Sequence, residues 1–202
     1  MSFGEIKANL SYLNGTDEGQ AQTGLIQRLV IINKSHLPDS GITFNSNHPT
    51  ALIDDITLDT GKTGYMLDLV NPNGTSIKHN NEFVEEESVR NGFRHILPEM
   101  LFPLNTVAAR EQINFMKDGR FYVVAERRFK GADRKEAFLF YGYPIGMQMI
   151  VTKDNSNEDS GLIFVTFQTP ENSNPEFLPH ILLDTDYATT LTAFENKFEN
   201  SN

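Results

Sequence analysis

The sequence contains no cysteine and no tryptophan. The absence of cysteine excludes disulfides, thiolate catalysis and zinc sites built on thiolates. No apolar run approaches the roughly 20 residues that a membrane-spanning helix needs. The first residues also lack the basic and apolar regions of a secretory signal. We therefore expect a protein that acts where it is made, or that leaves the cell inside a larger particle, with no membrane in its assembled state.

Basic residues are few, with 17 Lys and Arg against 27 Asp and Glu, so the formal net charge is −10. A chain of this charge is poorly suited to wrapping nucleic acid, because it cannot neutralise many phosphates. Apolar residues make up 39% of the 202 positions. This is enough for one domain to build a core without covalent cross-links.

Runs of β-branched and aromatic residues, separated by turn formers, predict a mainly β chain. Two glycines within residues 59–64 predict a hairpin that joins strands at 51–58 and 65–70. Residues 93–104 fit either a helical stripe or a strand, and Pro98 favours the extended form. The other expected strands lie at residues 25–32, 121–129, 136–151 and 162–169, and residues 181–183 could pair at a sheet edge.

One short helix is predicted over residues 106–118, inside this series of strands. Asn105 or Thr106 can cap its first turn, and Gly119 can end it in a left-handed conformation. Residues 187–198 could form a short terminal helix. The predicted fold is therefore mainly β with one short helix, of the β-sandwich or barrel-like type.

Three regions follow from this pattern. Residues 1–23 form an N-terminal arm, residues 24–170 form the β-sandwich domain, and residues 171–202 form a C-terminal extension.

No catalytic, cofactor-binding or metal site is predicted. The five histidines show no metal-ligand spacing, and the chain has neither a phosphate-binding loop nor a nucleophile elbow. Residues 154–161 resemble a calcium loop only superficially, because their acids do not have the required spacing. We expect a protein that is not an enzyme and that needs no cofactor and no small-molecule ligand.

A small basic segment stands out on this acidic chain, and it invites two interpretations. It can meet an acidic patch on a neighbouring copy, or it can simply block the pairing of sheet edges. Nucleic-acid binding is a third, less favoured interpretation. The basic residues are Arg127, Arg128, Lys130, Arg134 and Lys135, and the matching acidic segment is Glu85, Glu86 and Glu87.

The order of these features over residues 22–170 resembles the tail tube proteins of long-tailed bacteriophages and the tubes of contractile injection machines. The resemblance lies in the pattern of elements rather than in one short motif. Its pieces are residues 23–26 opening a strand, residues 53–62 with their turn, residues 82–86 leading to Phe93, the helix before residues 119–124, and residues 140–147 followed by 161–167.

This resemblance implies a ring of six copies, stacked into a tube within the virion and assembled in the host bacterial cytoplasm. The implied partners are further copies and other tail proteins, with DNA passing through without being held. An acidic bore repels phosphates over roughly 8–10 Å. The candidates to line it are Asp54, Asp55 and Glu126, because they lie in or beside predicted strands.

Other functions stay open at this point. The C-terminal region, residues 171–202, is longer than the tube pattern needs, which leaves a terminal or adaptor position possible. A head-decoration, connector or tail-terminator protein is one alternative. A non-viral β-sandwich that binds glycans is another, and the absence of Trp counts against it because Trp stacks most strongly on sugar faces.

Overall fold

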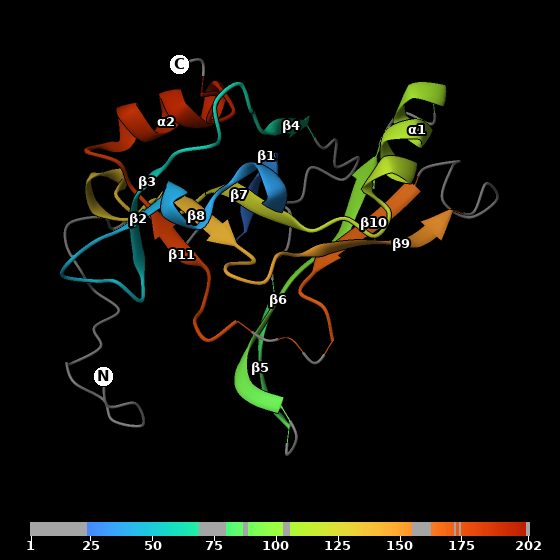
Figure 1. Ribbon diagram of the computed structural model, residues 1–202, viewed down its shortest axis with the longest axis horizontal. Helices are drawn as coiled ribbons and strands as arrows, with labels where there is room; N and C mark the ends of the chain where they lie inside the picture. Colours follow the sequence, from blue (N-terminus) through green and yellow to red (C-terminus); the bar gives the residue numbers. More distant parts are fainter. Residues whose placement is uncertain are drawn as a thin grey trace.

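The computed structural model describes residues 24–68, 80–86, 89–102, 106–154, 163–171, 173 and 175–200. The predicted N-terminal arm, residues 1–23, and most of the 154–161 loop lie outside this part. The described chain is mainly β, as the sequence predicts, and its strands form two sheets (Figure 1).

The larger sheet has seven strands, and the smaller has four. In spatial order, the seven-stranded sheet runs β2 (Ile42–Phe44), β3 (Leu52–Ile56), β11 (His180–Leu182), β8 (Phe138–Tyr141), β7 (Phe121–Arg127), β1 (Leu25–Asn33) and β4 (Tyr65–Asp68). In the same way, the four-stranded sheet runs β5 (Asn80–Glu86), β6 (Val89–Phe102), β10 (Ile163–Gln168) and β9 (Gln148–Asp154).

Two α-helices accompany the sheets. The predicted helix is α1 (Val107–Met116), and the second is α2 (Tyr187–Glu195), which lies along the seven-stranded sheet (Figure 1). The residue that turns left-handed after α1 is Asp118, with φ 62°, and not the expected Gly119. Gly119 is required for a different reason, because a Cβ there would lie 2.4 Å from the Phe121 ring. Three short 3₁₀ turns are η1 (Lys34–His36), η2 (Asp39–Gly41) and η3 (Ala132–Arg134).

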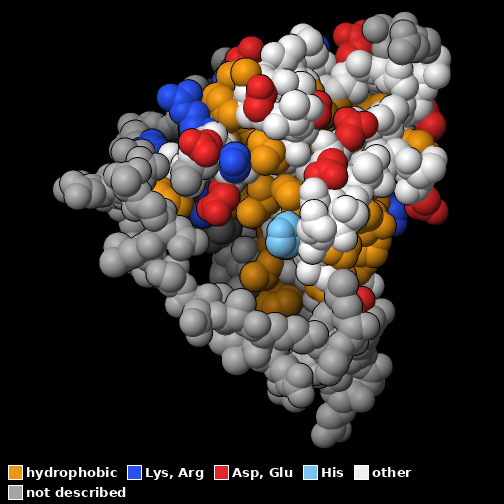
Figure 2. Space-filling model, turned by 90° about the vertical axis from the view of Figure 1, so that its left-hand side faces the viewer, with side chains coloured by type: hydrophobic (Ala, Val, Ile, Leu, Met, Phe, Trp, Pro, Cys, Tyr) orange, Lys and Arg blue, Asp and Glu red, His pale blue; other side chains and the backbone are white. Residues whose placement is uncertain are grey.

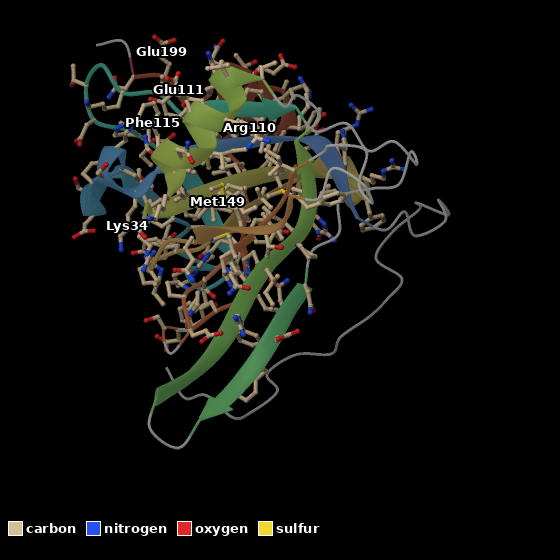
Figure 3. All side chains as sticks on the ribbon, turned by 90° about the vertical axis from the view of Figure 1, so that its right-hand side faces the viewer. Lys34, Arg110, Glu111, Phe115, Met149 and Glu199 are labelled. Carbon is tan, nitrogen blue, oxygen red and sulfur yellow. The ribbon has the colours of Figure 1, made fainter. Side chains whose placement is uncertain are left out.

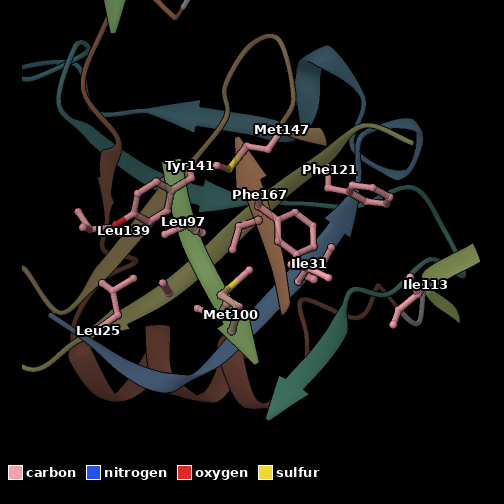
Figure 4. Packing of buried hydrophobic residues seen from close by; sticks show 14 of the residues in the cluster. Leu25, Ile31, Leu97, Met100, Ile113, Phe121, Leu139, Tyr141, Met147 and Phe167 are labelled. Carbon is pink, nitrogen blue, oxygen red and sulfur yellow. The ribbon is translucent and has the colours of Figure 1, made fainter. Parts of the chain in front are cut away.

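The first hydrophobic core lies between the two sheets. Side chains alternate along each strand, so one face of the seven-stranded sheet meets one face of the smaller sheet. Figure 4 shows Leu97 and Met100 of β6 and Phe167 of β10 packed among residues of the larger sheet, including Tyr141 and Ile31. From α1, Ile113 joins this core.

The second core covers the opposite face of the seven-stranded sheet. Val124 and Phe140 of the sheet pack in this core with Phe194 of α2 and Phe198 just beyond it. Because both faces are covered, all but the last residue of β7 are buried, and β7 reads as a nearly continuous apolar run. The seven-stranded sheet is therefore the middle layer of the protein.

The C-terminal region is an integral part of the seven-stranded sheet, which corrects the predicted extension. Strand β11 lies inside the sheet, parallel to β3 on one side and antiparallel to β8 on the other. The side chain of Asp186 caps α2 by accepting a hydrogen bond from Thr189 N at 2.8 Å. That bond holds the pKa of Asp186 below its usual value. The domain boundary expected after residue 170 therefore does not separate a peripheral arm.

The predicted hairpin at residues 59–64 is also wrong. Strands β3 and β4 lie far apart in the sheet order, with β4 at one edge. The connecting segment instead binds the C-terminal residues. Gly61 N donates to Asn200 O at 2.8 Å, and Gly64 N donates to Lys197 O at 2.8 Å. Residues 59–62 do form a turn, in which Lys62 N donates to Asp59 O at 2.9 Å and Gly61 has φ 72°, but this turn lies in a crossing segment and does not join two paired strands.

Residues 93–102 belong to the long strand β6, so the extended interpretation is confirmed there. Pro98 falls where the register with β10 shifts, which is a position that tolerates a missing N–H. Residues 136–151, expected as one strand, are two strands in different sheets. They are separated by a corner in which Gly142 (φ 92°) and Gly146 (φ 87°) adopt left-handed backbone angles.

Candidate assembly surface

The two sheets have very different edges. In the seven-stranded sheet the edge strands β2 and β4 have only three and four residues. In the four-stranded sheet the edge strands β5 and β9 have seven residues each. Within the described ranges, neither β5 nor β9 has a strand on its outer side. A long open edge presents unpaired N–H and C=O groups that can bind another strand, whereas a short edge cannot do so well.

Exposed apolar side chains lie along the β9 edge. Ile150 is 37% exposed and Val151 is 45% exposed, and they project to opposite faces of the strand. On the same side of the molecule α1 presents Phe115, which is 75% exposed (Figure 3). The sequence prediction missed this edge because it joined β9 to β8. The Gly142 to Gly146 turn was the signal that could have separated them.

The opposite edge belongs to a hairpin that projects from the body of the protein. Strands β5 and β6 pair antiparallel and extend away from the two cores (Figures 1 and 3). Phe83 of β5 is 59% exposed and packs edge-on against Phe93 of β6, with ring centroids 5.6 Å apart. The hairpin therefore has an apolar contact of its own, separate from the hydrophobic core in which the rest of β6 packs.

One row of residues across the outer face of the four-stranded sheet is polar at three of its four positions. The register places Gln168 of β10 opposite both Ile96 of β6 and Gln148 of β9, with Asn80 of β5 opposite Ile96. The neighbouring residues Leu97 and Phe167 point into the core, so this row points away from it.

One charged pair accompanies that row on the hairpin. Glu82 lies opposite Arg94, and Arg94 also approaches the carboxylate of Glu171 at 3.7 Å. Two carboxylates therefore lie near one guanidinium at this place, and the ion pair of Arg94 is made with Glu171.

The predicted bore-lining acids lie elsewhere. Asp54 and Asp55 are on β3 of the seven-stranded sheet, where Asp54 accepts from Asn45 Nδ2 at 3.0 Å. Asp55 accepts from Thr57 Oγ1 at 2.7 Å. Glu126 is only 3% exposed, so the prediction that it faces a solvent-filled bore is wrong. An acidic residue in a strand that is covered on both faces cannot reach bulk water.

Glu126 instead holds α2 to the sheet. Its Oε1 accepts a hydrogen bond from the Tyr187 hydroxyl at 2.9 Å and a second from Lys130 Nζ. Lys130 also donates to Tyr187 at 2.8 Å. Burial acts to lower the pKa of Lys130, but the bonds to Glu126 and Tyr187 outweigh it, so this pKa lies above its ordinary value. Lys130 is thus bound within its own chain.

The other basic residues of this segment also have local partners. Arg127 lies 3.8 Å from Glu136, and Lys135 lies 3.4 Å from Asp133. Arg134 lies over the Tyr187 ring, 5.2 Å from its centroid, while Arg128 is exposed.

On the face seen in Figure 2, basic side chains lie among acidic ones at the left, whereas acidic side chains predominate toward the top and right. The side chains of Glu85 and Glu86, and the whole of Glu87, lie outside the part that the structure describes, so the contact predicted between the basic and acidic segments stays a prediction.

The described part of the chain brings together few side chains that could bind a metal or take part in a reaction. No group of three or more potential metal-binding side chains occurs among those residues. An open groove runs beside α2, and its lining is mixed, with polar residues such as Thr57 and Asn196, apolar residues such as Phe198, and the acidic Glu199. Two histidines, His95 and His180, are buried, and burial lowers the pKa of each to about 4.

No protein-family model, curated protein or solved structure matches this chain. Among the residues that the structure covers, no helix has the length and apolar character needed to cross a bilayer.

Proposed function

We propose that this chain is a structural subunit that joins copies of itself through the edges of its four-stranded sheet. One observation carries the proposal: β5 and β9 are both long, both open, and lie at opposite edges of one sheet. A sheet with two open edges can add to itself head to tail. Such a contact closes into a ring when the rotation between neighbours allows it.

The ring proposed from this geometry agrees with the resemblance to phage tail tubes. Closing the small sheets into one barrel pairs the β5 and β9 edges of every copy, which is how barrels avoid uncontrolled pairing. The hairpin with Phe83 and Phe93 then lies between neighbours or between stacked rings, where its apolar contact is covered. We propose a ring of six copies that stack into a tail tube within a virion.

The inner surface of such a ring would be the outer face of the four-stranded sheet. Three of the four residues in its row, Asn80, Gln148 and Gln168, are polar and uncharged, and its Arg94 is paired with Glu171, so these side chains do not grip phosphates. The net charge of −10 opposes DNA binding by the chain as a whole. The bore candidates therefore move from Asp54, Asp55 and Glu126 to these residues, and DNA passes over a polar wall.

Negative-stain electron microscopy of the purified protein at rising concentration tests this proposal. We expect rings, and then stacked rings or tubes, as the concentration increases. A protein that stays monomeric at the highest attainable concentration and at several salt concentrations would contradict it. Binding of that monomer to a glycan array would favour the alternative of a sugar-binding module.

A further inference from the structure

Two buried imidazoles meet the segment that leads into β11. His95, on β6, is only 1% exposed, and its ring makes two hydrogen bonds. Its Nδ1 accepts from Gly142 N at 3.1 Å, and its Nε2 lies 2.9 Å from Phe177 O. The ring therefore ties the four-stranded sheet to the corner after β8 and to the C-terminal segment.

These partners fix the protonation state of His95. The Gly142 amide can only donate, so Nδ1 must carry a lone pair. Phe177 O can only accept, so the single proton of the neutral ring lies on Nε2. A second proton would place an N–H on Nδ1 facing the N–H of Gly142, and the bond between the corner and β6 would be lost.

His180 begins β11 and is 2% exposed. Aromatic rings surround it, with centroids at 5.5 Å for Phe44 and at 6.1 Å for both Tyr143 and Phe177. Neither of its ring nitrogens has a hydrogen-bond partner among the described residues. This environment suits a neutral ring and gives an imidazolium nothing to bind.

The titratable groups that face these rings are few. Tyr141 of β8 packs edge-on against His95 at 6.1 Å, and Tyr143 of the corner packs against His180. His180 also acts on His95, because its proximity adds to the effect of burial and further lowers the pKa of His95. Phe177, whose carbonyl binds His95 and whose ring packs on His180, belongs to the segment that both histidines hold.

We propose that His95 and His180 form an acid-sensitive latch, which holds residues 175–195 on the sheets at neutral pH and releases them on acidification. Protonation removes the bond between His95 and the corner and places a charge inside the aromatic cluster around His180. Release of β11 would separate β3 from β8 and uncover the second core. This latch acts within one chain, so it does not depend on ring assembly.

The direction in which pH changes the stability of the latch follows from the lowered pKa values of the two histidines. The released segment exposes histidines with an ordinary pKa of 6.5, whereas the latched histidines have a pKa of about 4. The latch is therefore fully stable above pH 6.5 and weakens as the pH falls toward 4. At pH 5 each histidine raises the equilibrium constant for release about thirtyfold relative to pH 7.5.

Hydrogen–deuterium exchange of the full chain tests the latch, read by mass spectrometry at pH 7.5 and pH 5 and corrected for intrinsic rates. We expect peptides within residues 175–195 to lose protection at pH 5, while peptides from β1 and β7 keep theirs. The variant His180→Phe keeps the aromatic packing and removes one titrating group. We expect it to reduce the pH-dependent loss about thirtyfold.

His95→Gln is the second variant, because its amide can still donate to Phe177 O but has no pKa in this range. We expect it to reduce the same pH-dependent loss while lowering protection at neutral pH. If His95→Gln does not fold, His180→Phe alone decides the question. The proposal is overturned if residues 175–195 stay protected at pH 5, if β1 and β7 open together with them, or if His180→Phe keeps the wild-type pH dependence.

Discussion

The seven-stranded sheet and the four-stranded sheet of this protein differ in what covers them. The larger sheet is covered on both faces, its edges are short, and its central strands β7 and β8 are almost wholly buried. The smaller sheet is covered on one face only, and its edges are long, open and partly apolar. This contrast indicates that the larger sheet supplies the stability of the monomer, whereas the smaller sheet is available for contacts with other chains.

A matched pair of phenylalanine substitutions tests the contrast with the largest expected effect. Phe140→Ala, in the fully buried centre of the seven-stranded sheet, should lower the free energy of unfolding by about 3–5 kcal/mol. Phe83→Ala, at a position 59% exposed on the hairpin, should lower it by less than about 1 kcal/mol. Urea denaturation of both variants measures the difference. Equal losses would contradict the division between the sheets.

Substitution of the buried carboxylate of Glu126, on β7, should have the next largest effect on the free energy of unfolding. Glu126→Gln removes the charge that neutralises Lys130, and Lys130 is 24% exposed, so water relieves part of the loss. We therefore expect a loss of about 2 kcal/mol in the free energy of unfolding, below the full cost of breaking a fully buried pair. Asp133→Asn is the control, because its pair with Lys135 is exposed and should change stability by no more than about 0.5 kcal/mol. A loss in Asp133→Asn as large as that in Glu126→Gln would refute this ranking.

Alkaline pH should lower the free energy of unfolding because of two buried tyrosines in the seven-stranded sheet. Burial raises the pKa of Tyr122 and of Tyr141 above the ordinary value of 10. Their contribution is complete below pH 10 and is lost as the pH rises above it, because only the unfolded chain releases these protons readily. At pH 11 we expect a loss of about 1.4 kcal/mol for each tyrosine.

Tyr122→Phe separates this pH effect from a simple loss of packing. The variant loses the hydrogen bond from the hydroxyl to Pro144 O, so it should be less stable at pH 7. Its further loss between pH 9 and pH 11 should be smaller than that of the wild type by about 1.4 kcal/mol. Parallel stability curves for the two proteins would show that Tyr122 ionises normally in the folded state.

The sequence predicted local structure better than sheet membership. The mainly β fold, the helix at 106–118 and the extended form around Pro98 follow from residue types within short windows. The parallel pairing of β11 with β3 joins residues about 130 positions apart, and no local pattern encodes it. For the same reason residues 51–70 appeared to be a hairpin, although β4 pairs with β1.

The site was harder to predict than the fold because it depends on which faces and edges stay uncovered. Glu126 was taken as a bore residue because it is an acid in a strand, but burial on both faces of β7 depends on α2, which lies far away in the sequence. Ile150 and Val151 were predicted only as the end of one strand at 136–151, and only the sheet order shows that β9 is an edge. Exposure of an edge is a property of the folded chain and not of its local sequence.

The most direct test of the central claim compares two lysine substitutions on edge strands by sedimentation velocity. Val151→Lys places a charge on the open β9 edge, and Thr43→Lys places one on the short β2 edge of the larger sheet. Both exposed positions should leave the free energy of monomer unfolding within about 0.5 kcal/mol of wild type. We expect Thr43→Lys to assemble as the wild type does and Val151→Lys to sediment as a monomer. Assembly of Val151→Lys at wild-type concentrations would show that the four-stranded sheet is not the edge through which copies join.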